Sequence, residues 1–188
     1  AIKKKNYPKA IQSLQEATHY IQKVEDVWGR VKKPYLQKRT SLNLFIGKKM
    51  GELVKEAPDA YGMGEQKHYY FIHAYNCIYE CQYCYLQGYF NSPDIVLFIN
   101  HDEIIQQMQK KVDMNPDSWF HAGEFSDSLA LSHITDEWSE YWDFFKKNKQ
   151  AKLELRTKSV NIKSIIIGFI CECFFFFLWF KPLALFYF

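Results

Sequence analysis

The chain has 188 residues, of which 48% are hydrophobic and 24% are charged. This length fits one domain with a sizeable core, and the composition excludes collagen, a coiled coil and simple disorder. A formal net charge of +3 is too weak to indicate a nucleic-acid partner by itself. Residues 1–75 carry 14 Lys and Arg against 7 Asp and Glu, and residues 76–188 carry 10 against 14; this asymmetry favours a solvated helical face over a basic arm that binds a polyanion.

The first third of the chain has helical patterns. Apolar side chains recur at three- and four-residue steps over 8–33, which predicts an amphipathic helix. A second helix is predicted over 48–55, and the Gly and Pro residues of 58–64 predict a loop. We assign residues 1–66 to an N-terminal helical region.

From residue 67 the strand and helix patterns alternate. Strands are predicted over 69–75, 95–99, 119–125 and 153–157, and helices over 102–112 and 133–147. Thr135 is the expected N-cap of the last helix, with Asp136 and Glu137 in its first turn, where their charges complement the helix dipole. The alternation is typical of βαβ units, so we predict an α/β fold with a parallel sheet.

The last segment, residues 164–188, departs from this pattern. It holds 8 of the 16 Phe and has only Glu172 and Lys181 as charged residues. The apolar run is shorter than the roughly 20 residues of a membrane-spanning helix. We interpret the segment as an aberrant hydrophobic tail of the kind that a damaged gene end produces. A membrane anchor and a pair of core strands are the alternatives.

The chain has five cysteines, which are Cys77, Cys81, Cys84, Cys171 and Cys173. An odd number in two tight groups argues against a disulfide framework. The cysteines therefore indicate a reducing, cytoplasmic compartment.

Three of them form a C-x3-C-x2-C run directly after a predicted strand: Cys77, Cys81 and Cys84. Thiolates this close repel one another, so a cation or a cluster must neutralise them. Structural zinc needs a fourth ligand, whereas a [4Fe–4S] cluster with three cysteine ligands keeps one iron open for a substrate or cofactor. The histidines that could complete a zinc site are His68, His73 and His101.

The cysteine spacing, with Tyr83 just before the third cysteine, resembles the radical S-adenosylmethionine (SAM) superfamily. Several further segments resemble the spore photoproduct lyase family, in order and at similar separations, over roughly residues 35–163. These segments are 81–86, 95–100 with 102–104, 122–127 and 155–159.

The resemblance implies a partial (β/α) barrel of the radical SAM type in residues 67–163. It also implies a [4Fe–4S] cluster and SAM as cofactors, which together generate a 5′-deoxyadenosyl radical, and a carbon–carbon lyase activity that repairs a thymine dimer in DNA. The implied partners are DNA and a reductant such as flavodoxin or ferredoxin. A membrane partner is suggested only by the hydrophobic tail.

Residue roles follow from the same resemblance. Cys77, Cys81 and Cys84 would hold the cluster. The residues expected to contact SAM are Tyr83, Glu124, Ser126 and Lys158, with the Lys158 ammonium facing the cofactor carboxylate. The alternatives are a helix cap for Ser126, a surface lysine for Lys158 and simple packing for Tyr83.

Glu124 departs from the family pattern. The lyases have a cysteine at this position that donates a hydrogen atom, and a carboxylate cannot do so as a thiol can. Gly123 and Glu124 instead resemble the strand end of other radical enzymes, where the glutamate binds the methionyl amino group. Radical cofactor chemistry is therefore better supported than photoproduct repair, and the substrate is left open.

The predicted core is also short for the family's barrel. We therefore expect an incomplete barrel that binds cluster and cofactor but has no counterpart of the family's later, substrate-gripping part. A structural zinc module and an inactive fragment are the alternative functions.

Overall fold

The computed structural model describes residues 43–58, 66–79, 81–90 and 92–160, together with the backbone of 176–178. The strands are β1 (Leu44–Gly47), β2 (Val54–Glu56), β3 (His68–Phe71), β4 (Ala74–Tyr75), β5 (Ile95–Phe98), β6 (Trp119–Ala122), β7 (Lys152–Leu155) and β8 (Phe176–Leu178). The helices are α2 (Leu86–Tyr89), α3 (His101–Met114), α4 (Ser132–Thr135) and α5 (Trp138–Lys147). The helix predicted over 8–33 lies outside the described residues.

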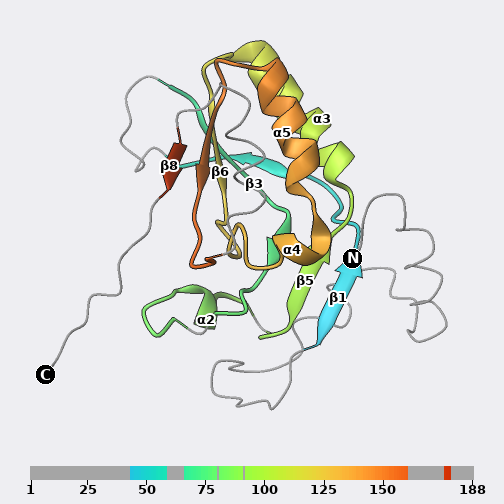
Figure 1. Cartoon of the computed structure of the whole chain (residues 1–188), viewed down its shortest axis with the longest axis vertical. Helices are drawn as coiled ribbons and strands as arrows, with labels where there is room; N and C mark the ends of the chain where they lie inside the picture. Colours follow the sequence, from blue (N-terminus) through green and yellow to red (C-terminus); the bar gives the residue numbers. More distant parts are fainter. Residues whose placement is uncertain (1–42, 59–65, 80, 91, 161–175, 179–188) are drawn as a thin grey trace, which may run out of the picture.

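The strands form two sheets (Figure 1). In the larger sheet the order is β2-β3-β6-β7-β8, with β2 antiparallel to β3 and the other neighbours parallel. In the smaller sheet β5 pairs in parallel with β1 and antiparallel with β4. The parallel run confirms an α/β fold. The described strands do not show the expected partial barrel, because they divide into two sheets and β5 pairs within the smaller one.

The strand predicted over 69–75 divides between these sheets. Its first part is β3, and its second part is β4. At the crossing, the Ile72 amide donates to the Leu53 carbonyl (2.9 Å) and the His73 carbonyl accepts from the Phe98 amide (3.0 Å). The chain therefore leaves the larger sheet and enters the smaller one just before the cysteine run.

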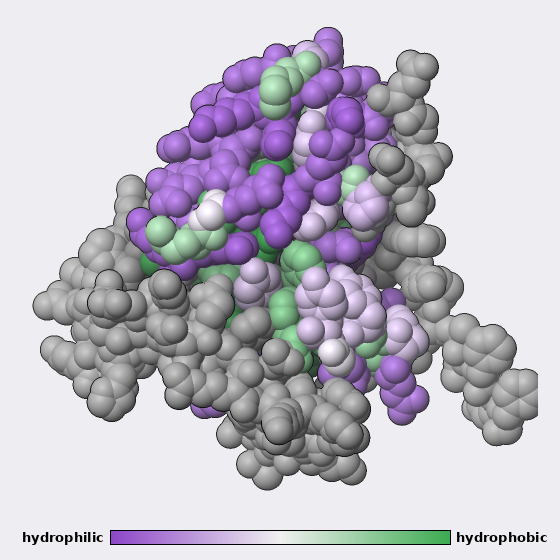
Figure 2. All heavy atoms as spheres, turned by 180° about the vertical axis from the view of Figure 1, so that it is seen from behind, coloured by the Kyte–Doolittle hydropathy of each residue, from purple (hydrophilic) through white to green (hydrophobic). Residues whose placement is uncertain are grey.

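The main core lies between the larger sheet and the two long helices, α3 and α5, which cover one face of it in Figure 1. Alternate residues of the central strands point into this core, as the two-residue period of a strand requires. These residues are Tyr69, Phe71, Phe120, Ala122, Leu153 and Leu155. The upper part of the molecule in Figure 1 is also the upper part in Figure 2, where its surface is mostly hydrophilic. The apolar stripes of the helices therefore face inward.

One helix prediction is wrong, and another is wrong in part. Residues 48–55 form no helix: Gly51 adopts a left-handed backbone (φ 83°), and Val54 begins β2. The Gln107 side chain accepts from the Leu53 and Val54 amides (2.8 and 3.1 Å), which fixes this turn against α3.

The helix predicted over 133–147 is broken by Asp136, which has φ 55°. The break separates α4 from α5. Thr135 does not cap α5, because its hydroxyl donates back to the carbonyl of Leu131, the residue before α4 (3.2 Å). The sequence pattern of apolar residues continues across the break, and periodicity alone does not reveal a single left-handed residue.

Part of the tail joins the sheet. Phe176–Leu178 forms β8, paired in parallel with β7, so these three residues do belong to the strand pattern. The rest of 164–188 lies outside the described residues. Among the residues that the structure does describe, we find no helix with the length and apolar character needed to cross a bilayer.

Phe120→Ala tests the core. Phe120 is fully buried in β6 and its ring lies 6.0 and 6.1 Å from those of Phe144 and Phe145. Truncation should lower the free energy of unfolding by about 3–5 kcal/mol, because it leaves a cavity in the core. Denaturant unfolding measures this. Met114→Ala, at a 65% exposed side chain, is the control, with an expected change within about 0.5 kcal/mol; equal losses in both variants would contradict this packing.

Candidate functional site

The cysteine loop begins at a fixed turn. Asn76, directly after β4, is buried and left-handed (φ 60°). Its side-chain amide donates to the Ser92 and Asp94 carbonyls, each at 2.7 Å. Farther along, the Cys84 amide donates to the Cys81 carbonyl (2.9 Å). The start of the loop is thereby anchored to the segment that enters β5, and its end is closed by a turn that runs into α2.

The three cysteine thiols are half-buried and interact electrostatically. Burial raises the pKa of Cys77 to about 12, against the effect of the Tyr79 amide, which donates to its sulfur (3.4 Å). The charges of Asp127, Cys84 and Cys81 raise this pKa further. A cationic group bound to the loop would reverse this balance and favour the thiolates, which fits iron–sulfur ligation.

No three His, Cys, Asp or Glu side chains within the described part of the chain are gathered closely enough to hold one metal ion. Two of the histidines considered for zinc lie in other contacts. His68 Nδ1 is 2.9 Å from His121 Nε2, and His101 Nδ1 is 2.9 Å from the Tyr141 hydroxyl. His73 is the candidate that lies beside the cysteine loop.

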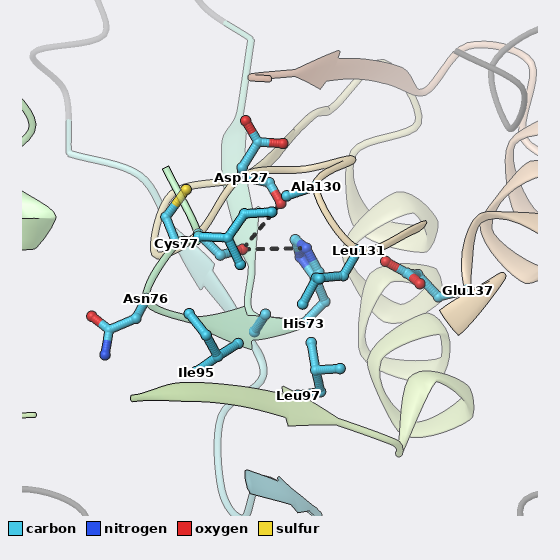
Figure 3. Close-up of a pocket in the computed structure, with 12 residues that line it drawn as sticks. His73, Asn76, Cys77, Ile95, Leu97, Asp127, Ala130, Leu131 and Glu137 are labelled. Carbon is cyan, nitrogen blue, oxygen red and sulfur yellow. Dashed lines mark hydrogen bonds between the residues drawn. The ribbon is translucent and has the colours of Figure 1, made fainter. Parts of the chain in front are cut away.

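A small pocket lies against this loop (Figure 3). It is lined by polar groups from three places in the chain, among them His73, Cys77, Ser126, Asp127 and Glu137. Burial lowers the pKa of His73 to about 3, so its ring is neutral at physiological pH. Its Nε2 lies 3.4 Å from Ser126 Oγ.

The loop after β6 folds closely against the end of β7 because of one glycine. Gly123 has φ 85°, in the region that favours glycine. A Cβ there would lie 2.6 Å from Ser128 Oγ and 2.9 Å from the Arg156 carbonyl oxygen. Glycine at this position therefore allows the two strand ends to meet.

Lys158 reaches from the end of β7 to the cysteine loop. Its Nζ lies over the Tyr83 ring, 5.5 Å from the centroid. A hydrogen bond with Tyr83 raises the pKa of Lys158 against the effect of burial, and the charges of Cys81 and Asp127 raise it further. Two of the predicted site residues, Tyr83 and Lys158, thus lie together.

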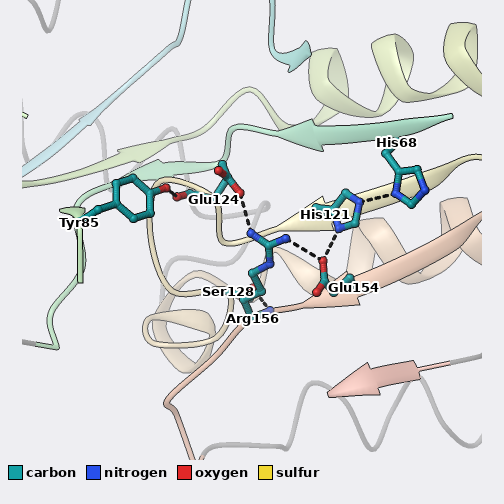
Figure 4. A network of polar contacts seen from close by, with 7 residues as sticks. All are labelled: His68, Tyr85, His121, Glu124, Ser128, Glu154 and Arg156. Carbon is teal, nitrogen blue, oxygen red and sulfur yellow. Dashed lines mark hydrogen bonds and ion pairs between the residues drawn. The ribbon is translucent and has the colours of Figure 1, made fainter. Parts of the chain in front are cut away.

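Glu124 lies in a different set of contacts (Figure 4). Its carboxylate accepts from Arg156 Nη1 at 2.7 Å, and its backbone carbonyl accepts from the Tyr85 hydroxyl. Arg156 also pairs with Glu154 (3.1 Å). From Glu154 the network continues to His121 and His68. In the structure the Glu124 carboxylate is thus held by Arg156, and its contact with SAM stays a prediction.

Two residues of the site were missing from the sequence-based set. Asp127 accepts hydrogen bonds from residues near the end of β7, and Arg156 holds Glu124. Both are charged residues next to the ends of predicted strands, where the sites of α/β proteins lie. Their position at predicted strand ends is the sequence signal that could have identified them.

Comparison with known proteins decides the family. Residues 65–168 match spore photoproduct lyase, which is more than half of the chain. The chain belongs to the spore photoproduct lyase family. The lyase of Geobacillus sp. (strain Y412MC61) is 30% identical over 96 residues, which cover 50% of this chain and 28% of that protein.

Solved structures of the family have the same fold. Spore photoproduct lyase complexed with dinucleoside spore photoproduct aligns with a TM-score of 0.59 and 23% identity. A mutant lyase with bound AdoMet and dinucleoside spore photoproduct aligns with a TM-score of 0.58 and 22% identity. Each alignment covers 71% of this chain and 38% of the solved one. The chain therefore spans about a third of the length of these relatives, and at these identities the likeness establishes the fold alone.

Glu137 is a buried carboxyl beside the pocket. It precedes α5, its side chain lines the pocket, and it is 5% exposed. Its Oε2 has no hydrogen-bond partner among the residues that the structure describes. Burial raises the pKa of this carboxyl from 4.5 to about 7, and the charge of Asp136 adds to the rise.

We predict that Glu137→Gln flattens the pH dependence of stability. Between pH 4.5 and 7 the unfolded chain has released this proton and the folded chain has kept it, so wild-type stability falls as the pH rises and levels off above 7. The difference in unfolding free energy between wild type and variant should change by roughly 2–3 kcal/mol from pH 5 to pH 8, in favour of the variant at pH 8. Denaturant titrations at both pH values measure it, with Glu52→Gln at an exposed side chain as control. Parallel curves for Glu137→Gln and wild type would contradict a raised pKa.

Proposed function

We propose that this chain binds a [4Fe–4S] cluster through Cys77, Cys81 and Cys84 and binds SAM beside it. The observation that supports this most directly is the contact between Lys158 and Tyr83, next to Cys81. It joins the three-cysteine loop to the carboxyl ends of the parallel strands, where ligands of α/β folds bind. Family membership supports the same cofactors.

The protein's own residues would orient the cofactor. When bound, the cluster supplies the electron that splits SAM into methionine and a 5′-deoxyadenosyl radical. The Lys158 ammonium is suited to pair with the SAM carboxylate through a charge-assisted hydrogen bond. The buried Ser126 hydroxyl offers a neutral polar contact, and Tyr83 offers an aromatic face. Glu124, held by Arg156, offers a carboxylate for the methionyl ammonium.

For the substrate we propose a pyrimidine lesion in DNA, the class that solved relatives hold as dinucleoside spore photoproduct. A reductant such as flavodoxin or ferredoxin would supply the electron. Glu124 stands where the lyases have the cysteine that donates a hydrogen atom. Neither its carboxylate nor the guanidinium paired with it can donate a hydrogen atom in the same way. We therefore expect this chain to bind the cluster and SAM. We expect it to repair a lesion only if another group donates the hydrogen atom.

Low-temperature electron paramagnetic resonance tests the proposal. The full chain is reconstituted anaerobically with iron and sulfide, reduced with dithionite, and measured with and without SAM. We expect a reduced [4Fe–4S] signal that changes shape when SAM is added. Bound zinc without a cluster would favour the structural zinc module, and a cluster signal that SAM leaves unchanged would contradict cofactor binding at an open iron.

Replacing Cys77, Cys81 or Cys84 with Ala should abolish cluster binding, because each thiolate ligates a different iron. Iron and sulfide analysis with the visible absorption spectrum measures the loss. Cys171→Ala is the matched control and should retain wild-type iron. A variant of the three-cysteine loop that still loads a full cluster would remove that cysteine from the ligand set.

Lys158→Met should weaken SAM binding about tenfold through loss of one charge-assisted hydrogen bond. Iron content should stay unchanged, because the ammonium ligates no metal. Equilibrium dialysis with labelled SAM measures the dissociation constant. Lys149→Met, at an exposed lysine after α5, should bind SAM like wild type. Equal SAM affinities for wild type and both variants would show that Lys158 does not contact SAM.

A further inference from the structure

One carboxylate joins the loops that follow β6 and β7. Asp127 Oδ1 accepts from the Leu129 amide (2.9 Å) and from the Thr157 hydroxyl (2.7 Å). Its Oδ2 accepts from the backbone amide of Lys158. The first of these bonds shapes the loop in which Asp127 lies, and the other two reach across to the end of β7.

The partners of Asp127 are themselves fixed. Thr157 is buried, and its hydroxyl oxygen also accepts from the Ser159 amide (2.9 Å). Beside it, the Ser128 amide donates to the Arg156 carbonyl (3.0 Å) and the Ser128 hydroxyl accepts from the Arg156 amide (2.9 Å). The backbone that carries Lys158 is thus held against the loop that carries Asp127.

This arrangement links two residues of the proposed cofactor site. Ser126 precedes Asp127 in the chain, and Lys158 donates its amide to it. The Asp127 carboxylate therefore sets the relative position of the Ser126 and Lys158 backbones. The Lys158 side chain then extends to Tyr83.

We propose that Asp127 is a positioning residue that holds the Lys158 ammonium in register with Ser126 and the cysteine loop. This inference rests on the proposed function of Ser126 and Lys158. Asp127 acts through its hydrogen bonds with the Leu129 and Lys158 amides and the Thr157 hydroxyl, so it needs no contact with the cofactor. A carboxylate suits the role because it has enough lone pairs for all three donors at once, and charge strengthens each bond.

Asp127→Asn is the first test. The amide keeps one acceptor oxygen, but its NH2 group cannot accept from Lys158. We expect the Lys158 amide to exchange with deuterium about tenfold faster and SAM to bind about tenfold more weakly, at unchanged iron content. Asp143→Asn, at a carboxylate on the outer face of α5 that is 70% exposed, is the control and should match wild type in all three measurements.

Thr157 gives an independent pair of variants should Asp127→Asn fold poorly. Thr157→Val removes the hydroxyl that donates to Asp127 and keeps the side-chain shape, and Thr157→Ser retains the hydroxyl. Weaker SAM binding by the valine variant, with near-wild-type binding by the serine variant, supports the proposal. Equal binding by the two variants would overturn it.

A double-mutant cycle separates positioning from general loss of structure. If Asp127 acts through Lys158, Asp127→Asn should not weaken SAM binding further in a Lys158→Met background. Additive losses, or wild-type affinity in Asp127→Asn alone, would overturn the positioning role while leaving the proposed function in place. A wild-type chain that loads a cluster but binds no SAM would overturn the proposed function itself. The role of Asp127 in SAM binding would fall with it, even if deuterium exchange at the Lys158 amide still differs between wild type and Asp127→Asn.

Discussion

Everything near the site depends on the burial of one face of the larger sheet against α3 and α5. Phe71 from β3 and Phe120 from β6 lie in this core with Tyr141 and Phe145 of α5. Burial of such large apolar side chains is the dominant favourable contribution to folding. It fixes β3, β6 and β7 side by side, so that the carboxyl ends of β6 and β7 meet. The polar contacts of Asp127 and Gly123 then operate on strand ends whose positions are already set.

The site has two polar systems with different partners. One gathers Ser126, Asp127 and Lys158 beside the cysteine loop. The other runs from Glu124 through Arg156 into the sheet. The first has the polar groups that a charged cofactor needs, and the second fixes the residue by which this chain differs from the lyases it resembles. The two systems meet at Arg156, because its guanidinium pairs with Glu124 and its backbone is held by Ser128 in the loop that carries Asp127.

Sequence periodicity predicted the elements that repeat a simple pattern. The helix over 102–112 and the strands at 95–99 and 153–157 are present with end shifts of a few residues. The missed features depend on single backbone angles and on pairing between distant residues. Asp136 breaks a helix through its φ angle, and β5 joins the smaller sheet through register with β1. Spacing identified the cysteine run, whereas the contacts of Asp127 join residues about thirty positions apart and leave no local pattern.

The crossing of the chain between its two sheets, at Ile72 and His73, ties the cysteine loop to both of them. The start of the loop therefore follows directly from backbone that is hydrogen-bonded to both sheets. A bound iron–sulfur chromophore would then report the assembly of the whole α/β unit. Brown colour in a purified variant that keeps all three cysteines would then serve as a visible sign that the unit has assembled.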